Sequence, residues 1–162
     1  SQEPFLFDDT VAANIAFASA SAKARDVDRV VDALGVRDWV DSLPHGLSTQ
    51  VGERGEQLSA GERQLVALLR AGLADPDILI LDEATSSVDA QTEVRLARAL
   101  ERLASTRTTS AIAHRVSTAA RADRVRVLEH GRLVQDGHHS ELIAEPGPYR
   151  RLYDAWSSAT TV

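Results

Sequence analysis

The sequence predicts an α/β fold on three observations. Residues 78–81 are a short, wholly apolar run, and residues 108–113 are expected to form another short strand. Longer segments with helical signals, residues 59–74 and 90–103, alternate with these runs along the chain. The 162 residues are 43% hydrophobic and 26% charged, as in ordinary globular domains. We therefore expect about one domain of packed α/β structure.

The first third of the chain is predicted to be two helices set between loops. Residues 1–8 are expected to be a loop, followed by a short helix at residues 10–17 with Asp8 or Asp9 near its cap. A second helix is expected where valine and leucine recur at the spacing of one buried stripe, at Val27, Val30, Val31 and Leu34. Gly35 ends this helix, and a polar loop rich in glycine covers residues 44–57.

The middle of the chain is predicted to contain a long helix and a buried strand. Ser59 begins the helix, which runs to about residue 74 because Pro76 stops it. The wholly apolar run at residues 78–81 is expected to be a strand buried on both faces of a parallel sheet. Asp89 is expected to cap the helix at residues 90–103.

The last third is predicted to contain strands, a hairpin and two short helices. The hairpin turns at His130 and Gly131, a dipeptide suited to a tight turn. The expected elements are a strand at 108–113, hairpin strands at 125–128 and 133–135, helices near 140–144 and 148–156, and a frayed tail at 157–162.

The composition argues against several classes of binding site. The net charge of −6 argues against a nucleic-acid groove or a polybasic membrane patch. The absence of cysteine excludes disulfides and thiolate metal sites. No targeting segment is recognisable, and the longest apolar stretches, residues 65–69 and 78–81, are too short to span a membrane. If the protein works at a membrane, we expect it to act from the aqueous side.

Two carboxylates follow the predicted strand at residues 78–81. Asp82 and Glu83 would lie at its carboxyl end, where open α/β sheets bind their ligands. In nucleotide hydrolysis, Asp82 would orient Mg²⁺ and Glu83 would position or polarise the attacking water. The alternative is that both residues merely mark the point where the strand leaves the core.

The run LSAGERQ at residues 58–64 has two interpretations that can hold together. Ser59 and Glu62 have the spacing of a capping box, which predicts a well-capped helix. A helix amino terminus with a serine hydroxyl and Gly61 is also suited to binding phosphate. If Glu62 folds back on the cap, Ser59 and Gly61 are left facing outward.

His114 follows the predicted strand at residues 108–113. A single histidine in this place is commonly structural. It becomes a candidate catalytic group if it shares a site with Glu83, where it could donate to a γ-phosphate or hold the attacking water.

Taken in order, these blocks resemble the ATP-binding-cassette (ABC) family from residue 1 to about residue 153. Gln2 resembles the Q-loop, residues 58–64 the signature, and residues 78–83 Walker B with its catalytic glutamate. Residues 87–89 resemble the D-loop, and His114 resembles the switch histidine. The implied fold is a P-loop NTPase-like ABC ATPase core with a helical signature subdomain.

Two further stretches resemble exporters within this family. Residues 49–55 resemble the X-loop, which exporters place beside the coupling helices of their membrane domains, and residues 113–142 are also exporter-like. The alternative for residues 49–55 is a glycine-rich surface loop. Two signature positions depart from the family, because Ala60 replaces a glycine and Glu62 a glutamine. Either Glu62 caps the helix or this signature binds ATP weakly.

No G-x-x-x-x-G-K-[ST] run occurs in the sequence, and the only lysine is Lys23. By resemblance, the Walker A loop would precede Gln2, so the chain corresponds to a truncated domain that lacks the N-terminal Walker A part. Residues 1–162 would then be a partial ABC ATPase domain. A helical signature subdomain would cover residues 10–75, and a Walker B and H-loop part would cover residues 76–156.

The resemblance implies a role for each site residue. Glu83 and His114 would be catalytic, Gln2 and Asp82 would serve Mg²⁺, and Ser59, Gly61 and Glu62 would belong to the ATP-binding signature. Asp89 would connect the two sites of a sandwich of two nucleotide-binding domains. The expected ligands are ATP and Mg²⁺. The expected partners are a second nucleotide-binding domain and transmembrane domains at the cytoplasmic face of the membrane, with no nucleic acid.

Two alternatives stay open at this point. One is a soluble ABC ATPase of DNA repair or translation, and the other is a non-catalytic ABC fragment. The isolated chain is expected to be inactive. By resemblance, the Walker A strand would lie between the strands at 108–113 and 125–128. Without that strand, we expect the strand at 125–128 to separate with its hairpin, to pair with another chain, or to pair with residues 108–113.

Overall fold

A computed structural model describes residues 4–82, 89–113 and 116–160 of the chain. The chain forms two compact units, Ser1–Ser110 and Ala111–Val162, and each is described by itself. The boundary predicted from the sequence lies near residue 75. Helix α5 packs on α4 and α2, so it belongs with the helical part of the chain.

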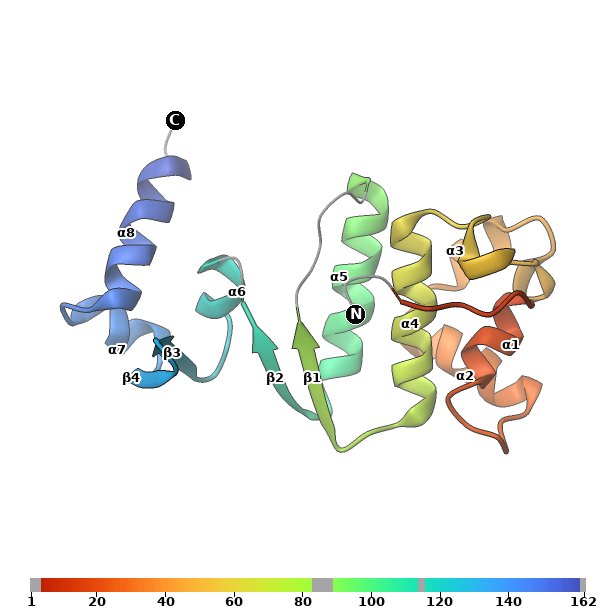
Figure 1. Cartoon of the computed structure of the whole chain (residues 1–162), viewed down its shortest axis with the longest axis horizontal. Coiled ribbons are helices and arrows are strands. Elements are labelled where there is room, and N and C mark those ends of the chain that lie inside the picture. The colour runs from red at the N-terminus through yellow and green to blue at the C-terminus, as the bar shows by residue number, and fades with distance from the viewer. Residues whose placement is uncertain (1–3, 83–88, 114–115, 161–162) are drawn as a thin grey trace. The chain divides into compact units, whose positions relative to one another are not determined.

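The first unit is mainly helical (Figure 1). Its elements are α1 (Val11–Ala16), α2 (Ala24–Leu34), α3 (Arg37–Ser42), the 3₁₀ turns η1 (Gly46–Ser48) and η2 (Glu53–Gly55), α4 (Ala60–Ala74), β1 (Ile78–Asp82), α5 (Ala90–Ala104) and β2 (Thr108–Ile112). The predicted helices are therefore present, and α3 is an additional one.

The helix caps follow from local side-chain chemistry. The cap of α1 is Thr10, whose hydroxyl accepts from the Ala13 N–H. Asp9, predicted to lie near the cap, precedes it and accepts from the Thr10 N–H at 2.7 Å. Helix α2 ends at Gly35, which adopts the left-handed conformation as predicted. Asp89 caps α5 as predicted, accepting from the Thr92 N–H at 2.9 Å.

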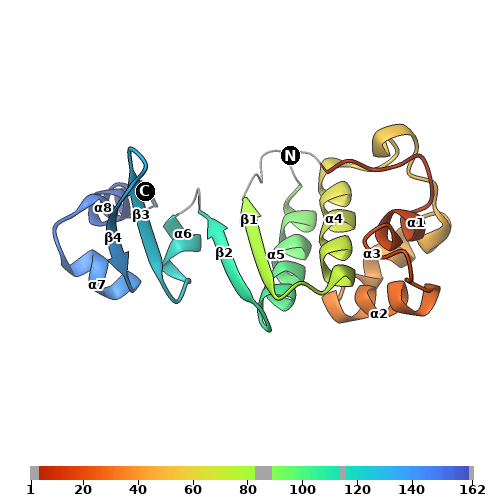
Figure 2. The same ribbon diagram turned by 60° about the horizontal axis from the view of Figure 1, so that its bottom comes forward.

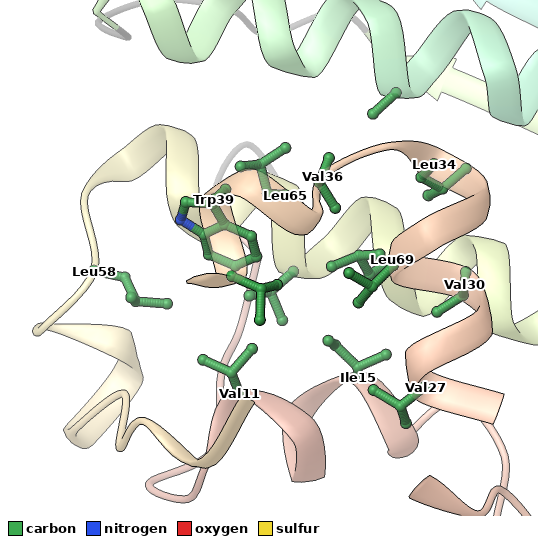
Figure 3. Close-up of a cluster of buried hydrophobic side chains, with 14 of the residues drawn as sticks. Val11, Ile15, Val27, Val30, Leu34, Val36, Trp39, Leu58, Leu65 and Leu69 are labelled. Atoms are coloured by element: carbon green, nitrogen blue, oxygen red, sulfur yellow. The ribbon is translucent and has the colours of Figure 1, made fainter. Parts of the chain in front are cut away.

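Buried side chains from α1, α2, α3 and α4 form the core of this unit (Figure 3). Ile15, Val31, Trp39, Leu65 and Leu69 are each at most 2% exposed. Figure 3 shows the labelled side chains of α1, α2 and α4 pointing toward one another. Helix α4 is therefore fixed by packing along its length, which holds its amino terminus in place.

Strands β1 and β2 form a two-stranded sheet and run in the same direction (Figures 1 and 2). Leu79 is buried in the core with Leu103 of α5, whereas Ile78 and Ile80 are 63% and 74% exposed. The prediction that β1 is buried on both faces was wrong for these residues. The core covers one face of the strand only, so alternate side chains remain exposed.

The second unit consists of a hairpin and three helices: α6 (Val116–Ala120), β3 (Val125–Glu129), β4 (Arg132–Gly137), α7 (His139–Ala144) and α8 (Pro148–Thr160). The hairpin turns at His130 and Gly131 as predicted, with φ of 50° and 76°. A small core of Val125, Leu142 and Tyr149 holds it to the helices. In the described chain β3 pairs with β4 and not with β2, so the hairpin forms a sheet of its own.

The tail of this unit is more ordered than predicted. Helix α8 continues to Thr160, so a frayed segment from residue 157 was wrong. The hydroxyls of Ser157 and Ser158 donate to the Asp154 carbonyl at 3.1 and 2.7 Å, which is compatible with helix.

Candidate functional site

The signature segment, residues 58–64, forms the amino terminus of α4. Ser59 is the N-cap and has extended backbone angles, φ −63° and ψ 163°. Its hydroxyl accepts from the Glu62 N–H at 3.3 Å, and Glu62 Oε2 accepts from the Ser59 N–H at 2.8 Å. The predicted capping box is therefore confirmed.

Glu62 has a further partner that the sequence analysis missed. Its Oε1 accepts from the indole Nε1–H of Trp39 at 3.1 Å, and Trp39 is 2% exposed at the centre of α3. A buried indole N–H usually has a hydrogen-bond acceptor. Trp39 was therefore the one signal in the sequence that could have indicated this contact. The two oxygens of Glu62 thus join the start of α4 to α3.

The pKa of Glu62 reports this environment. Burial raises its pKa, but the N–H of Ser59, the Trp39 indole and the Ser59 hydroxyl lower it, and the net shift is downward. The negative charge of Asp89 also raises the pKa of Glu62.

The first turn of α4 has the features of an anion site. Ser59 is exposed, and its hydroxyl oxygen accepts from the Glu62 N–H. The hydroxyl hydrogen can therefore be donated to a ligand. Helix starts leave their first N–H groups without intrahelical partners, here those of Ala60 and Gly61. Gly61 is buried, so the prediction that it faces outward with Ser59 was wrong. The positive end of the 15-residue helix adds to the attraction for an anion. These groups fit a phosphate oxygen.

The segment after Gln2 lies against the predicted X-loop. Val11 donates its N–H to the Thr49 carbonyl at 2.9 Å, and Val51 donates to the Asp9 carbonyl at 3.0 Å. Thr10 and Gln50 form an antiparallel bridge between these bonds. The X-loop in turn reaches the signature, because the Leu58 N–H donates to the Gly55 carbonyl at 3.0 Å. Backbone hydrogen bonds thus join the segment after Gln2, the predicted X-loop and the start of the signature.

The other predicted site residues are only partly described. Asp82 is the last residue of β1 and is exposed, and Asp89 is the cap of α5. The pKa of Asp89 is lowered, first by the Thr92 N–H. Gln2, Glu83 and His114 lie outside the described residues. Within the described ranges, no group of three or more His, Cys, Asp or Glu side chains is placed to hold a metal ion.

None of the helices in the described part of the chain is both long and apolar enough to cross a membrane.

Comparison with known proteins decides the family. The family model described as "ABC transporter" matches residues 1–86, which is more than half of the chain. The chain belongs to the ABC transporter family. The resemblance drawn from the signature, Walker B and D-loop motifs is therefore confirmed.

The curated relatives include an ABC transporter ATP-binding protein and lipid A-core flippases. The chain is 46% identical over 154 residues to YknV of Bacillus subtilis (strain 168), an uncharacterized ABC transporter ATP-binding protein, which covers 95% of this chain and 26% of that protein. It is 50% identical over 157 residues to the ATP-dependent lipid A-core flippase of Bordetella avium (strain 197N). That match covers 95% of this chain and 26% of the flippase. The chain thus spans about a quarter of the length of these ABC proteins.

A solved structure supports the same family and fold. The chain superimposes on a bacterial Atm1-family ABC exporter, solved with ATP bound, with a TM-score of 0.83 and 40% identity. The match covers 95% of this chain and 27% of that ABC exporter chain. The predicted fold class and the exporter-type membership are confirmed.

Proposed function

We propose that this chain is the signature-bearing part of a nucleotide-binding domain that hydrolyses ATP to power export across a membrane. The observation that carries the proposal is the capped start of α4 with its exposed Ser59, found in a chain whose relatives include exporters. The proposed substrate is ATP, with Mg²⁺ bound to its phosphates. The identity of those relatives favours export over a role in DNA repair or translation.

The start of α4 would bind the γ-phosphate of an ATP held mainly by a second nucleotide-binding domain. Ser59 would donate its hydroxyl hydrogen, and Gly61 would donate its backbone N–H. Glu62 would act through its carboxylate, which fixes Ser59 by the capping box and does not itself meet the phosphate. This arrangement separates the charge of Glu62 from the anion.

The residues that follow the strands would carry out hydrolysis. Glu83 would accept a proton from the attacking water, and His114 would hold that water and the γ-phosphate. Gln2 and Asp82 would provide oxygen ligands for Mg²⁺, the ligand type that this ion prefers. When bound, Mg²⁺ offsets negative charge on the phosphates. Asp89 would connect the two sites of the sandwich.

The proposed membrane partner has a suitable surface on the first unit. Phe5, Phe7 and Phe17 are 59%, 40% and 65% exposed. Their rings are in contact, with centroids 5.1 Å apart for Phe5 and Phe7 and 4.5 Å apart for Phe7 and Phe17. An exposed aromatic cluster favours contact with another protein. We propose that it and residues 49–55 face transmembrane domains at the cytoplasmic side of a membrane.

Substitution of Glu83 tests this function in the complete protein. We expect Glu83→Gln to lower the rate of ATP hydrolysis about 10²–10⁴-fold because an amide cannot act as a general base, while ATP binding is retained. The matched control is Glu145→Gln, at an exposed glutamate of the second unit. Turnover by Glu83→Gln above half the parent rate would contradict the proposal.

A further inference from the structure

Arg70, near the carboxyl end of α4, binds a segment more than 50 residues away in the sequence. Its Nε–H donates to the Asn14 carbonyl at 2.6 Å, and Nη2–H donates to Asn14 Oδ1 at 2.7 Å. Its Nη1–H donates to the Phe5 carbonyl at 2.5 Å. One guanidinium therefore holds both ends of the stretch from Phe5 to Asn14.

Asn14 completes this network from α1. It is 1% exposed, and its Oδ1 also accepts from the Phe7 N–H at 2.9 Å. Its Nδ2 donates to the carbonyls of Phe7 and Thr10, both at 3.0 Å. The stretch between Phe5 and α1 thus has its backbone fixed by two side chains rather than by regular secondary structure.

The three acceptors of Arg70 are neutral oxygens and not carboxylates. Burial of the guanidinium lowers the pKa of Arg70, and none of these three hydrogen bonds goes to a carboxylate that would raise it again. Such an arginine contributes the fixed, forked geometry of its donors more than its charge. A lysine has a compact ammonium and cannot reach three acceptors that are spread in this way.

We propose that Arg70 is a positioning residue that holds the segment following Gln2 in a fixed place relative to the signature helix. This inference rests on the proposed function, in which Gln2 serves Mg²⁺ and Ser59 binds phosphate. Arg70 lies 11 residues after Ser59, about 16 Å along the helix, so it acts through α4 and not on the nucleotide. Phe5, which it holds, is three residues after Gln2.

Loss of this link would leave residues 5–14, which follow Gln2 in the sequence, in their described arrangement for a smaller fraction of the time. The apparent affinity of a site falls in proportion to the fraction of molecules competent to bind. In the complete protein, we expect Arg70→Lys to raise the Mg²⁺ concentration that gives half-maximal ATP hydrolysis about threefold to tenfold, the effect of one or two lost hydrogen bonds. The maximal rate should change less than this.

Arg37 provides a matched control in the same unit. Its guanidinium also makes three bonds, to Asp32 Oδ1 at 2.8 Å, to Asp28 Oδ1 at 3.1 Å and to the Asp28 carbonyl at 3.1 Å. These bonds join α2 to α3 and do not reach the segment after Gln2. Arg37→Lys should therefore leave the Mg²⁺ dependence of hydrolysis within twofold of the parent, even if it lowers the melting temperature as much as Arg70→Lys.

The other end of the link gives a second test. Asn14→Ala should shift the Mg²⁺ dependence in the same direction, and Arg70→Lys combined with Asn14→Ala should shift it less than the product of the single effects, because both remove one interaction. Hydrogen–deuterium exchange of the complete protein should be faster over residues 4–14 in Arg70→Lys and unchanged there in Arg37→Lys. If Asn14→Ala does not fold, the two lysine variants decide alone.

The outcomes separate this inference from the proposed function. A parent protein without Mg²⁺-dependent ATP hydrolysis would overturn both. An active parent in which Arg70→Lys and Arg37→Lys have equal effects on the Mg²⁺ dependence would overturn the positioning role alone, because the loss would then be one of general stability.

Discussion

At the scale of single residues, Glu62 shows why a departure from a family pattern can have a local cause. Its two carboxylate oxygens accept from two different donors, the Ser59 N–H and the Trp39 indole. A glutamine has one acceptor oxygen and would turn its NH₂ group toward the other donor. A carboxylate therefore satisfies both donors, although the family signature usually has glutamine at this position.

We predict that Glu62→Gln lowers the free energy of unfolding, by about 1–2 kcal/mol, because one buried donor loses its acceptor. Chemical denaturation of the purified nucleotide-binding domain would measure it. Glu56→Gln is the control, since Glu56 is an exposed glutamate six residues earlier in the chain. Equal stability of Glu62→Gln and Glu56→Gln would show that the Trp39 and Ser59 bonds contribute little.

The lowered pKa of Glu62 predicts that its contribution to the free energy of unfolding depends on pH. The folded-state pKa of Glu62 lies below its ordinary value of 4.5, so its stabilising contribution is present above pH 4.5. It is lost as the pH falls through the lower folded-state pKa, because protonation removes the charged acceptor. We expect the stability difference between the parent and Glu62→Gln to be constant near neutral pH and to shrink below pH 4.5 in denaturation series. A difference that grows on acidification would contradict this.

At the scale of elements, the end of α2 depends on one glycine. Gly35 has a φ of 67°, a conformation that L side chains rarely adopt. A Cβ at this position would also meet the guanidinium of Arg102 on α5. We predict that Gly35→Ala lowers the free energy of unfolding by about 1–2 kcal/mol, measured by denaturation. Ala33→Gly in the same helix is a useful contrast, because its cost arises from helix propensity and not from strain.

The signature helix gives the prediction that concerns two chains. If α4 faces the ATP of a partner domain, Ser59→Ala should damage the partner's site and leave its own intact. Mixed dimers of the complete protein can test this, with Ser59→Ala on one chain and Glu83→Gln on the same or the other chain. In the proposed sandwich, each ATP site combines Glu83 of one chain with Ser59 of the other. When the two changes lie on opposite chains they affect the same site, so we expect the second site to stay active. When both lie on one chain, each site carries one change and we expect neither to be active. Survival when both lie on one chain would contradict the trans arrangement.

Most elements could be predicted because their signals are local. The capping box at Ser59, the Gly35 stop and the His130–Gly131 turn each follow from chemistry within a few residues. Helix α3 was missed because its six residues are too few for a clear periodic pattern, and it is held by Trp39 reaching α4. Which residue caps α1 was left open because three adjacent residues, at positions 8–10, can all serve as caps, and the structure selects Thr10.

What could not be predicted depends on contacts distant in the sequence. The exposure of Ile78 and Ile80 depends on which elements cover β1, and a short apolar run does not reveal this. The network of Arg70 joins residues 56 and 65 positions apart, so no spacing rule indicates it. For the candidate site, the sequence predicted the signature cap and the Asp89 cap, whereas the roles of Gln2, Glu83 and His114 remain proposals.

At the scale of the whole molecule, the proposed activity requires more groups than the chain itself provides. The described part offers a helix start for phosphate and the Asp82 carboxylate at the end of β1. The only lysine, Lys23, is the N-cap of α2 and does not belong to a glycine-rich phosphate loop. In P-loop NTPases, such a loop supplies a nest of backbone N–H groups and a lysine for the β- and γ-phosphates.

We therefore predict that the 162-residue chain alone neither binds ATP tightly nor hydrolyses it. The signature helix start supplies only a few donors, and an exposed single-helix anion site contributes about 0.3–1 kcal/mol from the helix dipole. That is far below the roughly 8 kcal/mol that micromolar affinity requires. Titration with a fluorescent ATP analogue and Mg²⁺ should give no saturation in the micromolar range, whereas the complete protein should saturate under the same conditions. Micromolar binding by the isolated chain would mean that residues outside the signature form a nucleotide site by themselves.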